Sequence, residues 1–142
     1  MSFDLRIKNA DLSIINGKLE KVTGSDKLIQ DILKIIYTDA GTNPFNPWYG
    51  SYFNKSIVGS NFDSEMIVKI SQNQLQNTLD MLKKIQQLQV SSLQTVTPDE
   101  QIASIVDISV NRSKVEPRLF DVIIKVLTRA LTPVNVNFSI NI

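Results

Sequence analysis

Carboxylates are the main side chains in this sequence from which a catalytic site could be built. The 142 residues include no cysteine and no histidine, which excludes disulfides, thiolate nucleophiles, serine–histidine catalysis and most zinc sites. A glycosidase holds two carboxylates about 5–10 Å apart across a cleft, but Asp99 and Glu100 are adjacent and Asp121 has no identifiable partner. We find neither a glycine-rich phosphate loop nor a metal-ligand spacing. We therefore expect no catalytic residues, no cofactor and no metal site, and a protein that is not an enzyme.

Composition and charge narrow the class of partner. Apolar residues make up 42% and charged residues 20% of the chain, the balance of an ordinary globular protein. The formal net charge is only +1 and the basic residues are dispersed, so we expect no nucleic-acid partner. The N-terminus lacks the pattern of a signal peptide, and no apolar run approaches the roughly 20 residues of a membrane helix. We expect a soluble protein without membrane insertion.

The first 23 residues predict a β-hairpin arm. Asn16-Gly17 suits a tight two-residue turn because both residues tolerate positive φ, and alternating apolar residues form an extended lead-in from Phe3 to Ile7. An isolated hairpin is marginally stable in water, so this arm must lie against something else. The apolar residues that flank the turn are Leu12, Ile14, Ile15, Leu19 and Val22.

Residues 24–92 predict a helical part interrupted by a loop. Ser25 is the expected N-cap of a first helix, which Gly41 is expected to end. Residues 42–52 then carry prolines and aromatic residues, including Trp48 and Tyr49, and predict a rigid irregular loop. That loop is either pinned to the core or used for binding, and in an oligomer both interpretations can hold.

Residues 63–90 predict one long helix that begins near Asp63. Two apolar stripes are offset across a glutamine- and asparagine-rich cluster, which indicates either a bend or two packing partners. About 27 helical residues span roughly 40 Å, which is long for so small a core. A partner helix from another chain and packing within the chain both remain open. The candidate partner-binding residues on this helix are Leu75, Leu79, Leu82 and Ile85.

Residues 97–142 predict an antiparallel three-stranded sheet, because apolar residues alternate with polar ones in the last third of the chain. The polar turn between the first two strands is expected around residues 111–116. The final strand, residues 134–142, is either a sheet edge or a strand donated to a partner. Its candidate partner-binding residues are Val134, Val136, Phe138 and Ile140. The sequence as a whole predicts a single α+β domain: an N-terminal hairpin, two main helices, one of them long, and the terminal sheet.

Several motifs occur in a characteristic order along the chain. Asn16-Gly17 is followed by Val22-Thr23-Gly24 and Gln30, then by residues 38–42 (TDAGT), 47–51 (PWYGS) and Val58-Gly59. This order resembles the small baseplate wedge, or sheath initiator, family, whose members occur in contractile phage tails, bacteriocin-like particles and type VI secretion baseplates. The resemblance covers nearly the whole chain.

That family has a Glu-Pro-Arg tripeptide between its helical part and its sheet, where it makes a contact in baseplate assembly. Glu116-Pro117-Arg118 reproduces the tripeptide literally, but in the expected turn between the first two strands. Glu100-Gln101 instead lies just before the first strand, where the family places the motif. We favour Glu100 as the counterpart; the arginine is then replaced by glutamine and the reach of a guanidinium is lost.

The resemblance implies a mechanical role in the tail baseplate of a virion assembled in the host cytoplasm. The implied partners are other wedge subunits, the tail hub or tube and the sheath protein, with six copies around the tail. The terminal strand would initiate the sheath by pairing with a sheath strand, so a chain without residues 134–142 would keep a foldable helical part and lose sheath initiation. The alternatives are a bracing subunit of a sheathless tail, a lysozyme-like cell-wall hydrolase, and a generic adaptor on the same scaffold.

Overall fold

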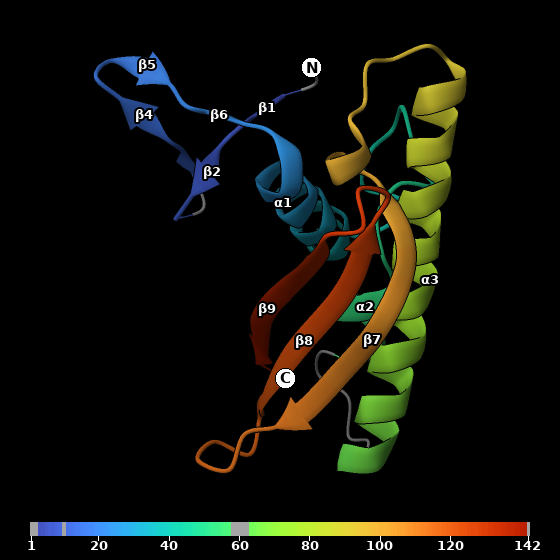
Figure 1. Cartoon of the computed structure of the whole chain (residues 1–142). Coiled ribbons are helices and arrows are strands. Elements are labelled where there is room, and N and C mark those ends of the chain that lie inside the picture. Colours follow the sequence, from blue (N-terminus) through green and yellow to red (C-terminus); the bar gives the residue numbers. More distant parts are fainter. Residues whose placement is uncertain (1–2, 10, 58–62, 142) are drawn as a thin grey trace.

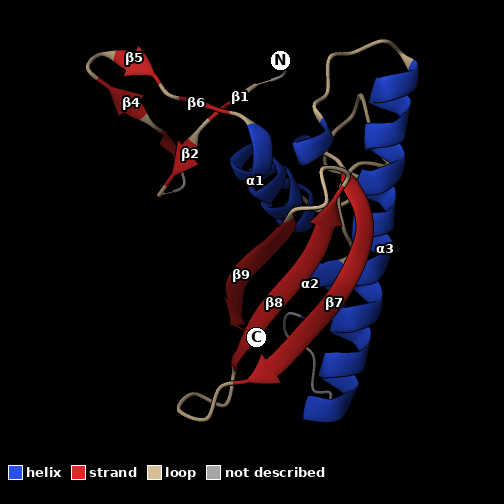
Figure 2. Cartoon of the chain, viewed as in Figure 1, coloured by secondary structure: helices blue, strands red, loops and turns tan. Residues whose placement is uncertain are grey.

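The computed structural model describes residues 3–9, 11–57 and 63–141 of the chain. Figure 1 shows an N-terminal arm that stands away from a body of helices packed against a sheet. The α+β class, the long helix and the C-terminal antiparallel sheet are confirmed (Figure 2). Val58 and Gly59 of the motif order, and residue 142 at the end of the predicted final strand, lie outside the described residues.

The arm consists of three short antiparallel pairs of strands instead of one hairpin. The Asn16-Gly17 turn forms as predicted, but Asn9 also adopts positive φ, so the lead-in folds back on itself. Strand β1 pairs with β6, β2 with β3, and β4 with β5. These strands are β1 (Asp4–Leu5), β2 (Ile7–Lys8), β3 (Asp11–Leu12), β4 (Ile14–Ile15), β5 (Lys18–Leu19) and β6 (Lys21–Val22).

The three pairs meet at a junction of Arg6, Ser13 and Glu20. Arg6 N–H donates to the carbonyl of Glu20, Ser13 N–H to Arg6, and Glu20 N–H to Ser13, at 2.8–2.9 Å. These residues are seven apart because residues 4–24 are three tandem heptapeptides, DLRIKNA, DLSIING and KLEKVTG. This repeat is the sequence signal for the three-part arm, and the hairpin pattern around Asn16-Gly17 does not contain it.

Helix α1 (Gly24–Tyr37) connects the arm to the body. The N-cap position is Thr23, two residues before the expected Ser25, and the Thr23 side chain makes no capping hydrogen bond. Gly24, the first residue of the helix, has a φ of +63°, which glycine adopts without strain. The helix ends at Tyr37, four residues before Gly41, where Thr38 becomes extended and bonds the Lys34 carbonyl through its N–H and its hydroxyl.

The loop after α1 is pinned to the end of that helix, as one of the two interpretations predicted. Ser51 N–H donates to the carbonyl of Thr38, and its hydroxyl donates to the carbonyl of Ile36. A Cβ at Gly50 would lie 2.6 Å from the Thr38 carbonyl oxygen, so the close approach requires glycine. A short helix that the sequence did not predict, α2 (Phe53–Ile57), follows and buries both of its end residues.

Helix α3 (Ser64–Ser91) is continuous over 28 residues and begins as predicted, with the Asp63 carboxylate accepting from Met66 N–H. It packs on β7 of the sheet and also contacts α1 and α2. Packing against the sheet on one side and the helices on another explains the offset stripes. Leu75, Leu79 and Leu82 are buried in the chain's own core, so packing within the chain, one of the two open interpretations, accounts for these three residues.

The sheet has the order β7-β8-β9 and is antiparallel. Its strands are β7 (Ile102–Arg112), β8 (Leu119–Thr128) and β9 (Pro133–Asn141), and the turn between the first two spans residues 113–118. Alternate residues of β8 and β9 are buried against the helices while their neighbours are exposed, so only one face of the sheet is covered. Before β7 lies the 3-10 turn η1 (Pro98–Glu100).

Candidate functional site

Strand β9 forms an open edge of the sheet. Among the described residues its only strand partner is β8, in an unbroken register from Leu119 opposite Asn141 to Leu127 opposite Pro133. Figure 1 shows β9 on the side of the sheet away from α3. Of the two interpretations of the last strand, an edge of this chain's own sheet is therefore the one realised here.

The hydrogen-bond phase of the hairpin identifies which backbone groups of β9 point outward. Thr128 N–H donates to the carbonyl of Thr132 across the turn. Because bonded and non-bonded pairs alternate in antiparallel strands and the register is unbroken, the residues whose backbone groups point to β8 are Val134, Val136, Phe138 and Ile140. The N–H and C=O groups of Asn135, Asn137, Ser139 and Asn141 then point away from the sheet.

The predicted apolar residues of β9 hold this edge in place and do not form its outer surface. Val134, Val136 and Ile140 are buried in the core. Phe138 packs edge-on against Tyr37 of α1 and Phe53 of α2, with ring centroids 5.7 and 6.2 Å apart. A partner at this edge would meet the outward backbone groups and the asparagine and serine side chains.

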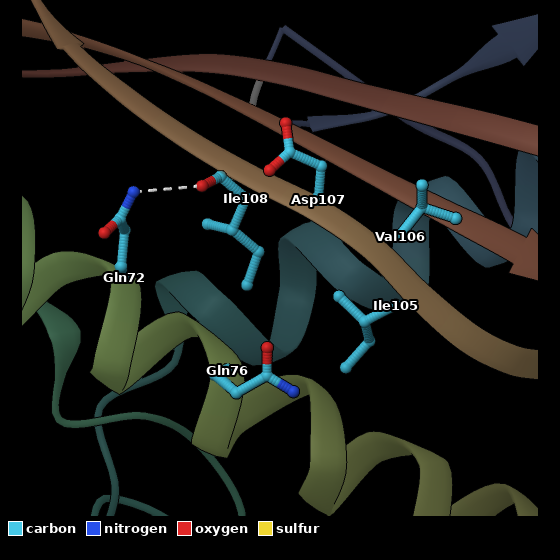
Figure 3. Close-up of a pocket in the computed structure, with 6 residues that line it drawn as sticks. All are labelled: Gln72, Gln76, Ile105, Val106, Asp107 and Ile108. Carbon is cyan, nitrogen blue, oxygen red and sulfur yellow. Dashed lines mark hydrogen bonds between the residues drawn. The ribbon is translucent and has the colours of Figure 1, made fainter.

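The opposite edge, β7, is closed. Its register with β8 shifts at two points, between Ile102 and Ser104 and between Ile105 and Asp107. Helix α3 lies alongside, and Gln72 Nε2 donates to the carbonyl of Ile108 at 3.2 Å (Figure 3). Irregular pairing and side-chain caps of this kind disfavour the addition of a further strand.

The start of β7 is held by a buried glutamine of α3. Gln86 is 4% exposed; its amide nitrogen donates to the Glu100 carbonyl and its oxygen accepts from Ile102 N–H. Glu100 itself is 1% exposed, and both of its carboxylate oxygens lack a hydrogen-bond partner among the described residues. Gln101 is buried too and donates to Val96 and Thr97 carbonyls. Partner contacts by Glu100 and Gln101 stay a prediction, and neither side chain is on the described surface.

Glu116, Pro117 and Arg118 lie in the β7–β8 turn and are exposed. Arg112 Nε donates to the Pro117 carbonyl, and no ion pair joins Glu116 to Arg118 among the described residues. The turn and η1 are at opposite ends of β7, which is 11 residues long and therefore about 35 Å from end to end. The two candidate motifs would therefore meet different parts of a partner.

An ionic network joins the arm to α1. Lys34 Nζ lies 2.5 Å from the carboxylate of Asp4, and Lys27 Nζ lies 2.9 Å from that of Asp31. Burial raises the pKa of Asp31, and its partner Lys27 offsets this only in part. Burial also acts on Asp4, but hydrogen bonds from Lys34, the Leu5 N–H and Gln30 outweigh it and lower the pKa of that carboxyl.

These groups line a cavity of about 280 Å³ between the arm, α1 and α3. Three of the predicted partner-binding residues, Tyr49, Leu82 and Ile85, are also in its wall. Burial and the nearby carboxylates raise the pKa of the Tyr49 hydroxyl. Trp48 is exposed beside it and packs edge-on against its ring at 6.3 Å. Among the described residues no group of three or more acidic side chains could hold a metal ion, and no helix is long and apolar enough to cross a membrane.

The molecule is thus an α+β protein whose sheet has one closed and one open edge. A structure search finds the same fold in a "putative tail lysozyme" from Geobacter sulfurreducens, with a TM-score of 0.60 and 11% sequence identity. The match covers 82% of this chain and 89% of that one. No family model and no curated protein matches the sequence.

Proposed function

We propose that this chain is a structural subunit of the baseplate of a phage-type contractile tail, and that the open edge of β9 initiates the sheath by pairing with a sheath strand. The observation that carries the proposal is the row of outward backbone groups on β9, with β8 as the only strand partner in the described chain. The motif resemblance and the fold shared with a protein named for a tail both support this setting.

Strand addition suits a protein that must start an ordered assembly. Unpaired N–H and C=O groups provide affinity, and the alternating side chains fix the register of the added strand. The core holds β9 rigid through its four apolar residues, so little ordering cost remains when a partner binds. The closed β7 edge leaves one direction for growth.

The test of the proposal is the substitution Asn137→Pro. Proline removes one outward N–H and is tolerated on an exposed edge, so the β8–β9 ladder and the fold should survive. We expect normal melting and loss of sheath initiation. Asn137→Thr is the matched control, because it keeps the N–H and should initiate normally. Normal sheath formation by a folded Asn137→Pro chain would contradict the proposal.

Deletion of residues 134–142 would not test the strand-pairing proposal, because these residues also belong to the core. Deleting residues 134–142 was expected to leave a foldable helical part, but Val134, Val136 and Ile140 belong to the hydrophobic core. Their loss would expose β8 and the inner faces of α1 and α2. A truncated chain that fails to initiate a sheath could simply be unfolded.

The remaining partners are part of the same proposal. Wedge and hub or tube subunits would be contacted in a sixfold arrangement, with Glu116, Pro117 and Arg118 as the exposed candidates for the wedge contact. If the particle has no sheath, the same fold would brace the baseplate. A chain found beside the tube of a sheathless tail would favour that alternative.

A second candidate function is glycoside hydrolysis, which the Asp4–Asp31 pair favours. The protein environment separates the pKa values of these two carboxyls, as it does in acid–base pairs, and the fold neighbour is named as a lysozyme. Against it, each carboxylate is already paired with a lysine, which suits attachment of the arm. Clearing of a peptidoglycan suspension by the wild-type chain but not by Asp31→Asn would establish hydrolysis; no clearing by either would exclude it.

A further inference from the structure

One flank of α1 carries a partly exposed apolar row beside the open edge of the sheet. Ile29, Leu33 and Tyr37 follow one another at intervals of four residues, so their side chains lie in line along the helix. Ile29 and Leu33 are half-buried at the margin of the core, and Tyr37 is 53% exposed. These three side chains are here called the α1 row.

The flank that carries the α1 row ends against β9. Lys27, Asp31 and Lys34 line the cavity that α1 shares with α3, and they lie on a different flank because each helical residue advances by about 100°. Tyr37, at the end of the row, packs edge-on against Phe138 of β9 with ring centroids 5.7 Å apart. Figure 1 shows α1 on the β9 side of the body and α3 on the β7 side.

The inner face of β9 is least covered where it meets the α1 row. Val134, Val136 and Ile140 are buried, whereas Phe138, which points to the same face of the sheet, is only half-buried. The Tyr37 ring that it contacts is half exposed as well. Phe138 and the α1 row therefore form one apolar surface that continues from the sheet onto the helix, at the edge where β9 has no strand partner besides β8 in the described chain.

A strand added to β9 would place every second side chain on this surface. Neighbouring strands lie about 4.8 Å apart, and successive side chains point to opposite faces of the sheet. The backbone groups of Phe138 point to β8, so the residue opposite Phe138 in an added antiparallel strand is a non-hydrogen-bonded partner, whose side chain lies close to the Phe138 ring. The side chains on the other face of the added strand would lie beside Asn137 and Ser139, which are exposed.

A second copy of this chain does not suit the surface. The apolar side chains of its β9 are already packed in its own core, with Phe138 against rings of α1 and α2. Antiparallel pairing of two β9 edges would also place the helices of both copies on the same face of the joined sheet. The occupant must instead bring apolar side chains that no helix of its own covers on this face, which is the property of an extended segment.

We propose that the strand that pairs with β9 is an extended amphipathic segment of another tail protein, and that its apolar face packs on the α1 row. The inference rests on the proposed function, because it names the kind of strand that the β9 edge accepts. Backbone pairing gives affinity for many sequences, while the α1 row selects apolar residues at alternate positions. A slip of one residue would turn polar side chains onto the row, so Tyr37 is a specificity-determining residue that also fixes the register.

The test compares Tyr37→Ser with Tyr37→Phe in the full-length chain. The probe is the sheath protein of the same tail, and the dissociation constant of the complex is measured. We expect loss of the ring in Tyr37→Ser to weaken binding on the order of 10-fold, whereas Tyr37→Phe keeps the ring and should bind within about 2-fold of the wild type. Leu88→Ser is the matched control, because Leu88 is an apolar residue of α3 that is 65% exposed, and it should also bind like the wild type.

Photo-crosslinking tests the same contact without weakening it. Tyr37 would be replaced by p-benzoylphenylalanine, which keeps an aromatic ring at this position, and the complex with the sheath protein would be irradiated. We expect a crosslink to an apolar residue within an extended segment of the sheath protein, and none when the replacement is made at Leu88. A crosslink from position 37 to a charged residue or to a helix would overturn the inference.

Amide exchange at Asn137 separates this inference from the proposed function, because it reports strand pairing itself. Protection of the Asn137 amide in the complex, with unchanged affinity in Tyr37→Ser, would overturn the inference and leave the proposed function in place. No binding, or binding without protection of Asn137, would contradict both. Equal weakening by Tyr37→Ser and Leu88→Ser would overturn the inference, as would self-association that protects Asn137 and that Tyr37→Ser weakens, which would assign the surface to a second copy.

Discussion

The two edges of the sheet differ in how well they are protected against the addition of another strand. Edge β7 has two register shifts, a helix beside it and a glutamine capping the Ile108 carbonyl. Edge β9 has a regular register with β8, no bulge, and outward backbone groups that no described segment bonds. Both belong to the same three-stranded sheet and share the central strand, so the difference does not come from the fold class.

The difference shows that the β7 edge is protected against strand addition and that the β9 edge is much less so. An unprotected edge risks aggregation, and proteins usually cover, twist or charge such strands. Here one edge has three protective devices, while β9 has the proline at its first position and polar side chains on its exposed face. An edge kept open beside one so carefully closed is consistent with strand addition as its use.

The largest effect is expected from Leu79→Ala, which weakens the packing of α3 that covers β7. Leu79 is fully buried in the core, so truncation should cost about 2–5 kcal/mol of unfolding free energy. Urea denaturation measures this loss. Asn77→Ala, on the exposed side of the same helix, is the control and should change little. A loss below about 1 kcal/mol at Leu79 would show that α3 is not an integral cover.

A smaller loss is expected when the start of β7 is released from α3. Gln86→Ala would leave the Glu100 carbonyl and the Ile102 N–H without partners in a buried position, at a cost of about 2–3 kcal/mol. Amide exchange at Ile102 should accelerate together with the loss of stability. The exposed neighbour Gln87 provides the control substitution to alanine. Unchanged protection of Ile102 would mean that β7 is fixed by other contacts.

Opening the β7 edge directly should affect association more than stability. Gln72→Ala removes the cap on the Ile108 carbonyl at an exposed site, so we expect a loss of about 0.5 kcal/mol. Sedimentation at high concentration should then reveal more self-association than the wild-type chain shows under the same conditions. Gln76→Ala is the matched control, because within the described part of the chain that side chain bonds Asp80 of the same helix and no group of β7. Equal self-association of the two variants would show that Gln72 does not protect the β7 edge.

The smallest effect is expected from acid, and it should separate the arm from both edges. The folded-state pKa of Asp4 is lowered, so its contribution to stability is present above the ordinary value of 3.8 and is lost as pH falls through the folded value. The raised pKa of Asp31 has the opposite sign and destabilises the fold as pH rises past 3.8. At acid pH, the protection of the amide from exchange, corrected for the intrinsic rate at that pH, should fall at Leu5 and Ile7 but not at Val136. An equal fall in protection at all three would contradict a local role for Asp4.

The positions of α3 and of the three strands could be predicted from patterns within each segment of the sequence. The Asp63 cap and the apolar period located α3, and the alternation of apolar residues located the three strands. The expected cap at Ser25 and the expected end at Gly41 were wrong. The helix begins at Gly24, which has a positive φ, and ends where Thr38 becomes extended and bonds the Lys34 carbonyl; the apolar period carries no signal for either feature.

The candidate site was predictable only as a segment. The alternation of residues 134–142 identified β9 but left edge and donation open, and which backbone groups point outward follows from the bond between Thr128 and Thr132. Gln72 and Gln86 gave no signal, since each bonds backbone 14–36 residues away. The arm had a signal in its heptapeptide repeat, which requires a comparison of the sequence with itself.

Cryo-electron microscopy of the assembled tail particle tests the central claim most directly. The account predicts that residues 133–141 pair with a strand of the first sheath ring, through the backbone groups of Asn135, Asn137 and Ser139. It also predicts that the outer edge of β7, where Gln72 bonds the Ile108 carbonyl, pairs with no strand of a partner. A β9 edge that faces solvent or is covered by side chains alone, with the sheath starting elsewhere, would contradict the account.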